Sequence, residues 1–290
     1  MMPAGLLSTI DKRQHMELDG RTVSCSMKRK VSAGPPCHEL SQQCDRSSQK
    51  MVKDANRMTN EAIGVAISPF ASVDSVFLRY GLAKDVGQEV VQACFDLLKS
   101  NMEVFYKAAW SWKDKTKMNE LLSPSARIIS LWRDSKLPSI LPAAESSADV
   151  DCSLDESGEC GSAGDESGWE TDDDDCEASM HAFAHYRFCT EEGILSGNPD
   201  KRLPVLYIWE MQVSESCRGR GYGRTLMDML TAIASAASMH SLVLTVFSSN
   251  TKAVSFYKHM GFDHTMDCPS RTQSDSPHFI LCKRVSAPCM

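Results

Sequence analysis

The sequence contains no apolar run of 18 residues or more, so it offers no segment long enough to cross a lipid bilayer. Residues 1–13 lack the charged-then-apolar order of a secretory signal, and Met2 stands where a myristoylation motif needs glycine. The 12 cysteines form no Cys-x-x-Cys pair, and no histidine cluster has zinc-finger spacing. We therefore expect no metal, no membrane partner, and reduced thiols in the cytoplasm or nucleus.

Lysine and arginine are absent from residues 143–179, which hold 14 aspartates and glutamates. The whole chain carries a formal charge of −7, but the remaining 31 basic and 24 acidic residues give the rest of it +7. The acidic total indicates no direct nucleic-acid partner, although the body of the protein is basic. With few aliphatic residues, 143–179 cannot offset the entropy cost of ordering, so we predict a disordered insertion that replaces a hairpin turn.

Residues 1–49 are rich in serine and glutamine and show no sustained apolar period, which predicts a disordered tail. The basic cluster at 28–30 within this tail is either a nuclear import signal or an ordinary solvated charge run. Residues 50–285 are expected to form one domain interrupted by the acidic insertion, followed by a short tail at 286–290. We expect a monomer in the nucleus and cytoplasm.

Hydrophobic periodicity divides the domain into alternating strands and helices. Predicted strands are 73–80, 126–132, 182–189, 203–213, 242–247 and 278–285. Predicted helices are 85–110, 113–122, 222–238 and 251–260. This order predicts an α/β fold with a mixed central sheet of about six or seven strands and flanking helices.

A glycine- and arginine-rich loop, Arg-Gly-Arg-Gly-Tyr-Gly-Arg at 218–224, lies between a predicted strand and a predicted helix. Glycines let the backbone turn its N–H groups toward one point, and the following helix N-terminus favours negative charge, so the loop suits a pyrophosphate. The spacing fails both the Walker pattern and the dinucleotide fingerprint. It does fit Arg-x-x-Gly-x-Gly, as Arg218, Gly221 and Gly223.

That pattern resembles the GNAT superfamily of acetyltransferases, in which it cradles the pyrophosphate of acetyl-coenzyme A. A second stretch, running from Asn250 through Ala253, Phe256 and Tyr257 to Gly261-Phe262, is similar to the closing motif of the superfamily. The resemblance implies the GNAT fold over residues 50–285 outside the insertion, with acetyl-coenzyme A as the co-substrate.

A narrower resemblance is to the histone-specific N-alpha-acetyltransferases, the N-terminal acetyltransferase D family. It is carried by Asn101-Met102, Tyr106, the Trp-Ser-Trp-Lys-Asp run at 110–114, Val-Leu-Tyr at 205–207 before Glu210, and Leu-Thr-Val-Phe at 244–247. The resemblance implies acetyl transfer to the amino-terminal serine of histone tails beginning Ser-Gly-Arg-Gly.

The same resemblance implies site residues, position by position. The implied coenzyme A contacts are Met211, Gln212, Val213, Arg218, Gly219, Arg220, Gly221, Tyr222, Gly223, Arg224 and Asn250. The implied peptide contacts are Tyr106, Trp110, Glu191, Trp209, Thr245 and His278. Three positions depart from the family: Trp209 and His278 stand where it has tyrosine, and Cys189 where it has an acidic residue.

Two residues are candidates for the proton transfers. Glu210 lies in an otherwise apolar strand, where desolvation is expected to raise its pKa toward neutrality and make it a general base; the alternative is pairing with a loop arginine. Tyr257 is either the donor to the departing thiolate or a core aromatic. A modest base suffices for an α-amine, because with a pKa near 8 roughly a tenth of it is neutral at pH 7.

Other functions stay open at this point. The three departures are compatible with an acetyltransferase acting on other amino termini, lysines or small amines. A non-catalytic protein that binds histones through its acidic insertion is a third possibility. The insertion itself either steers a cationic tail by long-range attraction or is a solvated linker.

Overall fold

The computed structural model describes residues 37–70, 76–133, 179–192, 194, 201–271 and 275–285. The basic cluster at 28–30, the tail at 286–290 and the acidic insertion up to residue 178 lie outside these ranges. Among the described helices, none combines the length and the apolar content that crossing a bilayer requires.

The core of the fold is a seven-stranded sheet in the order β1-β2-β3-β4-β5-β7-β6. Its strands are β1 (Val76–Leu82), β2 (Arg127–Arg133), β3 (Ser179–Glu191), β4 (Leu203–Val213), β5 (Ser241–Phe247), β6 (Asp263–His264) and β7 (His278–Arg284). All neighbours pair antiparallel except β4 and β5, which are parallel. The predicted mixed α/β sheet is therefore confirmed. The acidic insertion joins β2 to β3, which pair antiparallel as a hairpin would.

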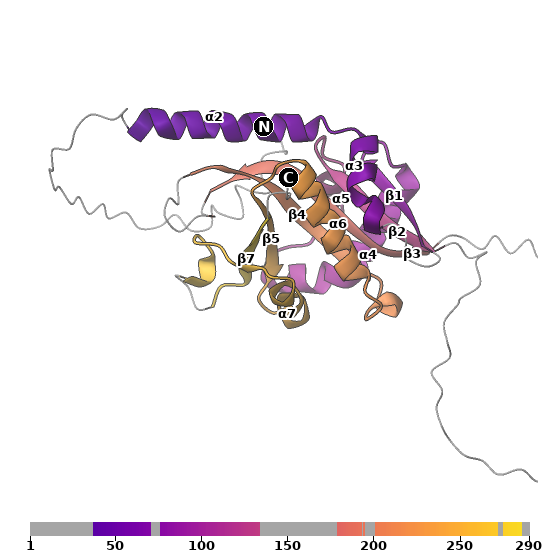
Figure 1. Cartoon of the computed structure of the whole chain (residues 1–290). Helices are drawn as coiled ribbons and strands as arrows, with labels where there is room; N and C mark the ends of the chain where they lie inside the picture. The colour runs from indigo at the N-terminus through magenta and orange to yellow at the C-terminus, as the bar shows by residue number, and fades with distance from the viewer. Residues whose placement is uncertain are drawn as a thin grey trace, which may run out of the picture.

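Helices cover both faces of this sheet, which explains why its central strands are apolar on both sides. One face packs against α3 (Asn60–Ile67), α6 (Tyr222–Ala236) and α7 (Thr251–His259), and the other against α4 (Gln88–Ala109) and α5 (Asp114–Leu121). The long helix α2 (Cys37–Asn56) lies across the end of the sheet (Figure 1) and contacts β3 and β4.

The prediction that residues 1–49 are disordered is wrong from Cys37 onward, where α2 begins. Tertiary contacts stabilise this polar helix: Ser48 is buried and its Oγ donates to the carbonyl of Arg202 at 2.8 Å. Ala55 joins the core, and Nδ2 of Asn56 donates to the carbonyl of Phe188 at 3.4 Å. Most helical stability comes from such packing rather than from local propensity, which is why composition misled here.

The ladder between β4 and β5 is short. It pairs Val205 to Ile208 with Ser241 to Leu244, although β4 continues to Val213 and β5 to Phe247. Beyond Ile208 and Leu244 the two strands continue but are no longer paired with each other. This divergence opens the sheet on its carboxyl-terminal side, next to the start of α6.

The same part of β4 contains a β-bulge. Tyr186 of β3 lies opposite Ile208, but the next residue back, His185, lies opposite Glu210, so Trp209 is an extra residue. A bulge re-aims the side chains that follow it. Trp209 and Glu210, although consecutive, both contact groups on the α4–α5 side of the sheet: the Arg187 guanidinium and the Tyr106 hydroxyl respectively.

Burial in the core predicts a large difference between two leucines. Leu226 of α6 is 0% exposed, whereas Leu122, at the end of α5, is 45% exposed. We expect Leu226→Ala to lower the free energy of unfolding by about 2–5 kcal/mol because it leaves a cavity, and Leu122→Ala by well under half of that. Urea unfolding of both variants measures this; equal losses would contradict the described core.

Candidate active site

A cavity of about 590 Å³ occupies the gap between the diverging ends of β4 and β5. Helix α4 closes one side of it, and α7 with the start of α6 closes the other. Twelve predicted site residues line it: Tyr106, Trp110, Trp209, Glu210, Met211, Gln212, Val213, Arg218, Gly223, Thr245, Asn250 and Tyr257. Seven others lie outside the lining: Glu191, Gly219, Arg220, Gly221, Tyr222, Arg224 and His278.

The glycine-rich loop turns into α6 at the rim of the cavity. Gly219 and Gly221 have φ values of 79° and 88°, in the left-handed region that favours glycine, and a Cβ on either would meet open space. Arg220 and Arg224 are exposed beside them. Backbone N–H groups at a helix start and exposed guanidinium groups are the kinds of group that bind a pyrophosphate.

Arg218 is tied to the cavity wall rather than left free in solvent. Its guanidinium donates to Oδ1 of Asn101 on α4 at 2.9 Å, and Nδ2 of Asn101 donates to Oε1 of Gln212 and to the carbonyl of Val213, both at 3.1 Å. This chain of contacts fixes the loop relative to the end of β4. Tyr222, by contrast, is buried with its ring 5.1 Å from that of His181, which is a core contact.

Asn250 caps α7. Its Oδ1 accepts from the backbone N–H of Ala253 at 3.2 Å, which satisfies one of the unpaired donors of the first turn. Asn250 also lines the cavity, together with Arg218 and Gly223 from the loop and the start of α6. The predicted helix at 251–260 is confirmed within one residue as Thr251–His259.

The buried carboxylate of Glu210 is the chemical centre of the cavity. Glu210 is only 8% exposed, and its Oε1 accepts from the hydroxyl of Tyr106 at 2.9 Å. The ammonium of Lys117 on α5 lies 3.7 Å from the same oxygen, and Nε2 of Gln212 lies 3.5 Å from Oε2. Its described cationic partner is thus a helix lysine rather than the loop arginine that the sequence offered as an alternative.

Two buried tyrosines flank Glu210 and stay protonated at neutral pH. Burial raises the pKa of Tyr106 well above its usual value, and the Glu210 charge adds to the shift. Burial also raises the pKa of Tyr257, again with a contribution from Glu210. Tyr257 lines the cavity and packs edge-on against Phe256 and Phe262, so its ring belongs to the aromatic core beside the site.

Aromatic rings form the mouth of the cavity on the side away from the loop. Trp110 is 36% exposed and its ring lies 4.7 Å from that of Phe247 and 5.3 Å from that of His278. Thr245 is fixed by a 2.6 Å hydrogen bond between its hydroxyl and that of Tyr207. His278 therefore packs against the Trp110 ring and does not line the cavity itself.

Glu191 is far from this mouth along the sheet. Glu191 pairs with Leu203, whereas Glu210 pairs with His185. His185 and Glu191 are six residues apart on β3, which corresponds to roughly 20 Å of strand. The Cys189 thiol donates to Oε1 of Glu191 at 3.8 Å. Burial raises the pKa of this thiol, and the negative charge of Glu191 raises it further. Cys189 is therefore no thiolate nucleophile.

Several residues of the site were not predicted to act there. Asn101 was quoted for its resemblance, but not as the link between Arg218 and β4. Lys117 was not singled out, although its spacing of four from Leu121 places both on the buried face of α5. Phe105 and Phe247 also line the cavity. Among the described residues, no group of three or more histidines, cysteines, aspartates or glutamates could hold a metal ion.

Comparison with known proteins agrees with this geometry. The family model of the acetyltransferase (GNAT) family matches residues 156–262, which include β4, the glycine-rich loop and α7. A curated relative, N-alpha-acetyltransferase 40 of Saccharomyces cerevisiae, is 29% identical over 102 residues, or 31% of this chain. The matched region spans 35% of the length of that relative. Both matches are to acetyltransferases.

Solved structures with a similar arrangement include two from Arabidopsis thaliana. One is NAA60 in complex with a bisubstrate analogue, with 12% identity, a TM-score of 0.44, and coverage of 72% of this chain and 99% of that one. The other is Naa50 in complex with the bisubstrate analogue CoA-Ac-MVNAL, with 15% identity, a TM-score of 0.40, and coverage of 72% and 98%.

The two glycines at the start of α6 are expected to respond oppositely to alanine. Gly221→Ala forces a Cβ into the left-handed region, which costs about 1–2 kcal/mol of stability. Gly223 lies inside the helix, and its added Cβ would meet Phe256 at an ordinary 3.5 Å, so Gly223→Ala should be neutral or stabilising by up to about 1 kcal/mol. Urea unfolding distinguishes them; a destabilised Gly223→Ala beside an unaffected Gly221→Ala would contradict the loop geometry.

Proposed function

We propose that this protein is a peptide N-alpha-acetyltransferase, which transfers acetyl from acetyl-coenzyme A to the amino terminus of another protein. The observation that carries the proposal is the buried Glu210 carboxylate, placed in a cavity whose other end meets the glycine-rich start of α6. A base and a pyrophosphate site at opposite ends of one cavity hold an amine and a thioester in line.

The reaction follows from the residues in place. The neutral amine nitrogen attacks the thioester carbonyl, and its proton passes to Glu210, directly or through a water. Because β4 leaves β5 after Ile208, the backbone N–H groups near Met211 are available to polarise that carbonyl. The C–S bond then breaks, and Tyr257, protonated throughout the neutral range, donates to the departing thiolate.

Within this class we propose histone tails beginning Ser-Gly-Arg-Gly as the substrate. A tail extended from the cavity along β3 would run in the direction of Glu191. Glu120 and Glu210 share the single ammonium of Lys117, so this pair of carboxylates has a net negative charge that favours a cationic tail. The yeast relative is named as an N-alpha-acetyltransferase, which supports an α-amine over a lysine side chain.

A second candidate is an amino terminus without an early basic residue. The Arg187 guanidinium lies 4.1 Å from the centre of the Trp209 ring, so a cation already occupies part of the face along which the tail would run. Like charge there disfavours an arginine in the substrate. The departure at Cys189, where the histone-specific pattern has an acidic residue, points the same way.

We also propose that the protein acts in the nucleus and cytoplasm, as a monomer. The basic cluster at 28–30 supports entry into the nucleus, and the described cysteines Cys94, Cys189, Cys217, Cys268 and Cys282, which form no disulfide, fit a reducing compartment.

Replacing the base should separate catalysis from binding. We expect Glu210→Gln to lower kcat by about 10²–10⁴-fold while coenzyme A still binds, because the amide keeps the size of the side chain but cannot take a proton. Glu61→Gln, an exposed change on α3, is the matched control. Acetyl-coenzyme A turnover and equilibrium dialysis measure the two properties. Full activity in Glu210→Gln would refute the base role, and an inactive wild type that retains histones would indicate a binding protein instead.

A peptide pair tests the substrate. The free peptide Ser-Gly-Arg-Gly-Lys should be acetylated, and its amino-blocked form, which still carries lysine, should not, since a lysine amine is several hundred-fold less often neutral at pH 7. Mass spectrometry locates the added acetyl group. A third peptide with aspartate in place of arginine tests the second candidate: faster turnover of that peptide than of the arginine form would replace the histone proposal.

A further inference from the structure

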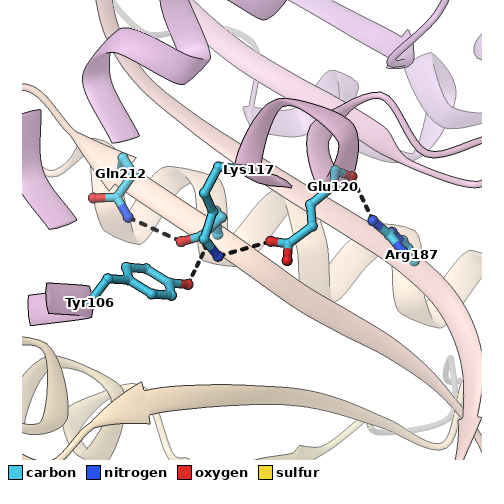
Figure 2. Close-up of polar contacts among 6 residues, drawn as sticks. Tyr106, Lys117, Glu120, Arg187 and Gln212 are labelled. Carbon is cyan, nitrogen blue, oxygen red and sulfur yellow. Dashed lines mark hydrogen bonds and ion pairs between the residues drawn. The ribbon is translucent and has the colours of Figure 1, made fainter. Parts of the chain in front are cut away.

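Lys117 is an unusual residue for the interior of a protein, because lysine is rarely buried unless it is paired. Its side chain is 8% exposed, and it sits on the inner face of α5 with Leu121. The ammonium lies 2.8 Å from Oε2 of Glu120, 3.7 Å from Oε1 of Glu210 and 3.8 Å from the centre of the Tyr106 ring. Figure 2 shows it beside Tyr106, directed at Glu120.

This arrangement divides one ammonium between two carboxylates. Glu120 belongs to the same helix and is 22% exposed, whereas Glu210 is 8% exposed. The backbone carbonyl of Glu120 accepts from the Arg187 guanidinium at 2.6 Å, so the end of α5 is anchored to β3 (Figure 2). The helix that carries Lys117 is therefore fixed relative to the sheet, and the position of its ammonium is fixed with it.

Three other titratable groups near Glu210 in the described part of the chain are neutral at physiological pH. They are Tyr106 from α4, Tyr257 from α7 and His185 from β3. Burial raises the pKa of Tyr106 and of Tyr257, and burial followed by the Arg187 and Lys117 charges holds the pKa of His185 well below its usual value.

The charged groups in this region are Lys117 and Glu120 from α5 and Arg187 from β3. Arg187 is directed toward the Trp209 ring and the Glu120 backbone. Lys117, in contrast, lies within 4 Å of the Glu210 carboxylate. Within a low-dielectric site, an opposite charge at this distance strongly favours the ionised carboxylate.

We propose that Lys117 is the positioning residue of Glu210, keeping its carboxylate ionised and oriented to accept a proton from the incoming amine. Tyr106 and Lys117 converge on Oε1, and Oε2 faces Gln212, which lines the cavity. The inference rests on the proposed function and extends it by naming what keeps the base ready.

The test is a carbon-13 NMR titration of the glutamate carboxyl groups in the full chain, with the Glu210 signal assigned from Glu210→Gln. We expect Lys117→Met to move the titration midpoint of Glu210 upward by about one pH unit or more, because the ammonium no longer favours the ionised form. Lys117→Arg should keep the midpoint near that of the wild type. Lys115→Met, an exposed change on the same helix, is the matched control and should leave it unchanged.

Glu120→Gln gives a shift of opposite sign. Without the Glu120 charge, Lys117 pairs with Glu210 alone, so the midpoint should move downward. This variant keeps the inference testable if Lys117→Met fails to fold. A Glu210 midpoint unmoved in Lys117→Met, or unmoved in Glu120→Gln when the first variant does not fold, would overturn the proposal.

Kinetics then separate positioning from simple structural support. Activity needs ionised Glu210, so the acid limb of the kcat profile of Lys117→Met should move to higher pH by the same amount as the NMR midpoint, with kcat lost on the acid side and recovered as the pH rises. The KM for acetyl-coenzyme A should not change. An equal loss of kcat at every pH would assign Lys117 a structural role only. The NMR midpoints do not depend on turnover, so an inactive wild type would refute the proposed function and leave this inference separately measurable.

Discussion

The pairing of β4 with β5 ends at Ile208 and Leu244, and the whole site depends on that end of the ladder. If the two strands stayed paired to Val213 and Phe247, their backbone groups would satisfy each other and the space now available to ligands would be filled. Because they diverge, the end of β4 presents both backbone and side chains to a cavity. The cost of leaving a sheet unpaired in the interior is one that functional sites tolerate and packed cores avoid.

The bulge at Trp209 turns this opening into a chemical site. In a regular strand Trp209 and Glu210 would point to opposite faces, and Glu210 would lie on the side of α6 in an apolar core. With one extra residue in β4, Glu210 instead meets Tyr106, Lys117 and Gln212. A carboxylate that would be expensive to bury alone is thereby paired and hydrogen-bonded, so its burial becomes compatible with a stable fold.

The sequence predicted the sheet well because its central strands are apolar runs bounded by turns; β4 matched at both ends. It failed where structure depends on partners distant in sequence. Helix α2 is polar and gains its stability from β3 and β4, and the eight-residue α3 buries Ile63 and Ile67 in a core that composition does not reveal. The loop and Glu210 were found through motif and strand context. Lys117 was not predicted, because no local sequence pattern indicates that a lysine on an amphipathic helix contacts a carboxylate 93 positions later.

The charge balance at Glu210 bears on a problem that every base of this kind faces. A lone buried carboxylate would stabilise an arriving α-ammonium in its protonated form, and a protonated amine cannot attack a thioester. In the proposed mechanism the shared ammonium of Lys117 weakens that attraction, so that an ionised Glu210 does not hold the substrate as an ion pair. Glu120 neutralises part of the Lys117 charge, so the three residues together carry a net negative charge that still attracts an amine. Three alternating charges thus place the site between two unproductive extremes, a base that is already protonated and a substrate that never loses its proton.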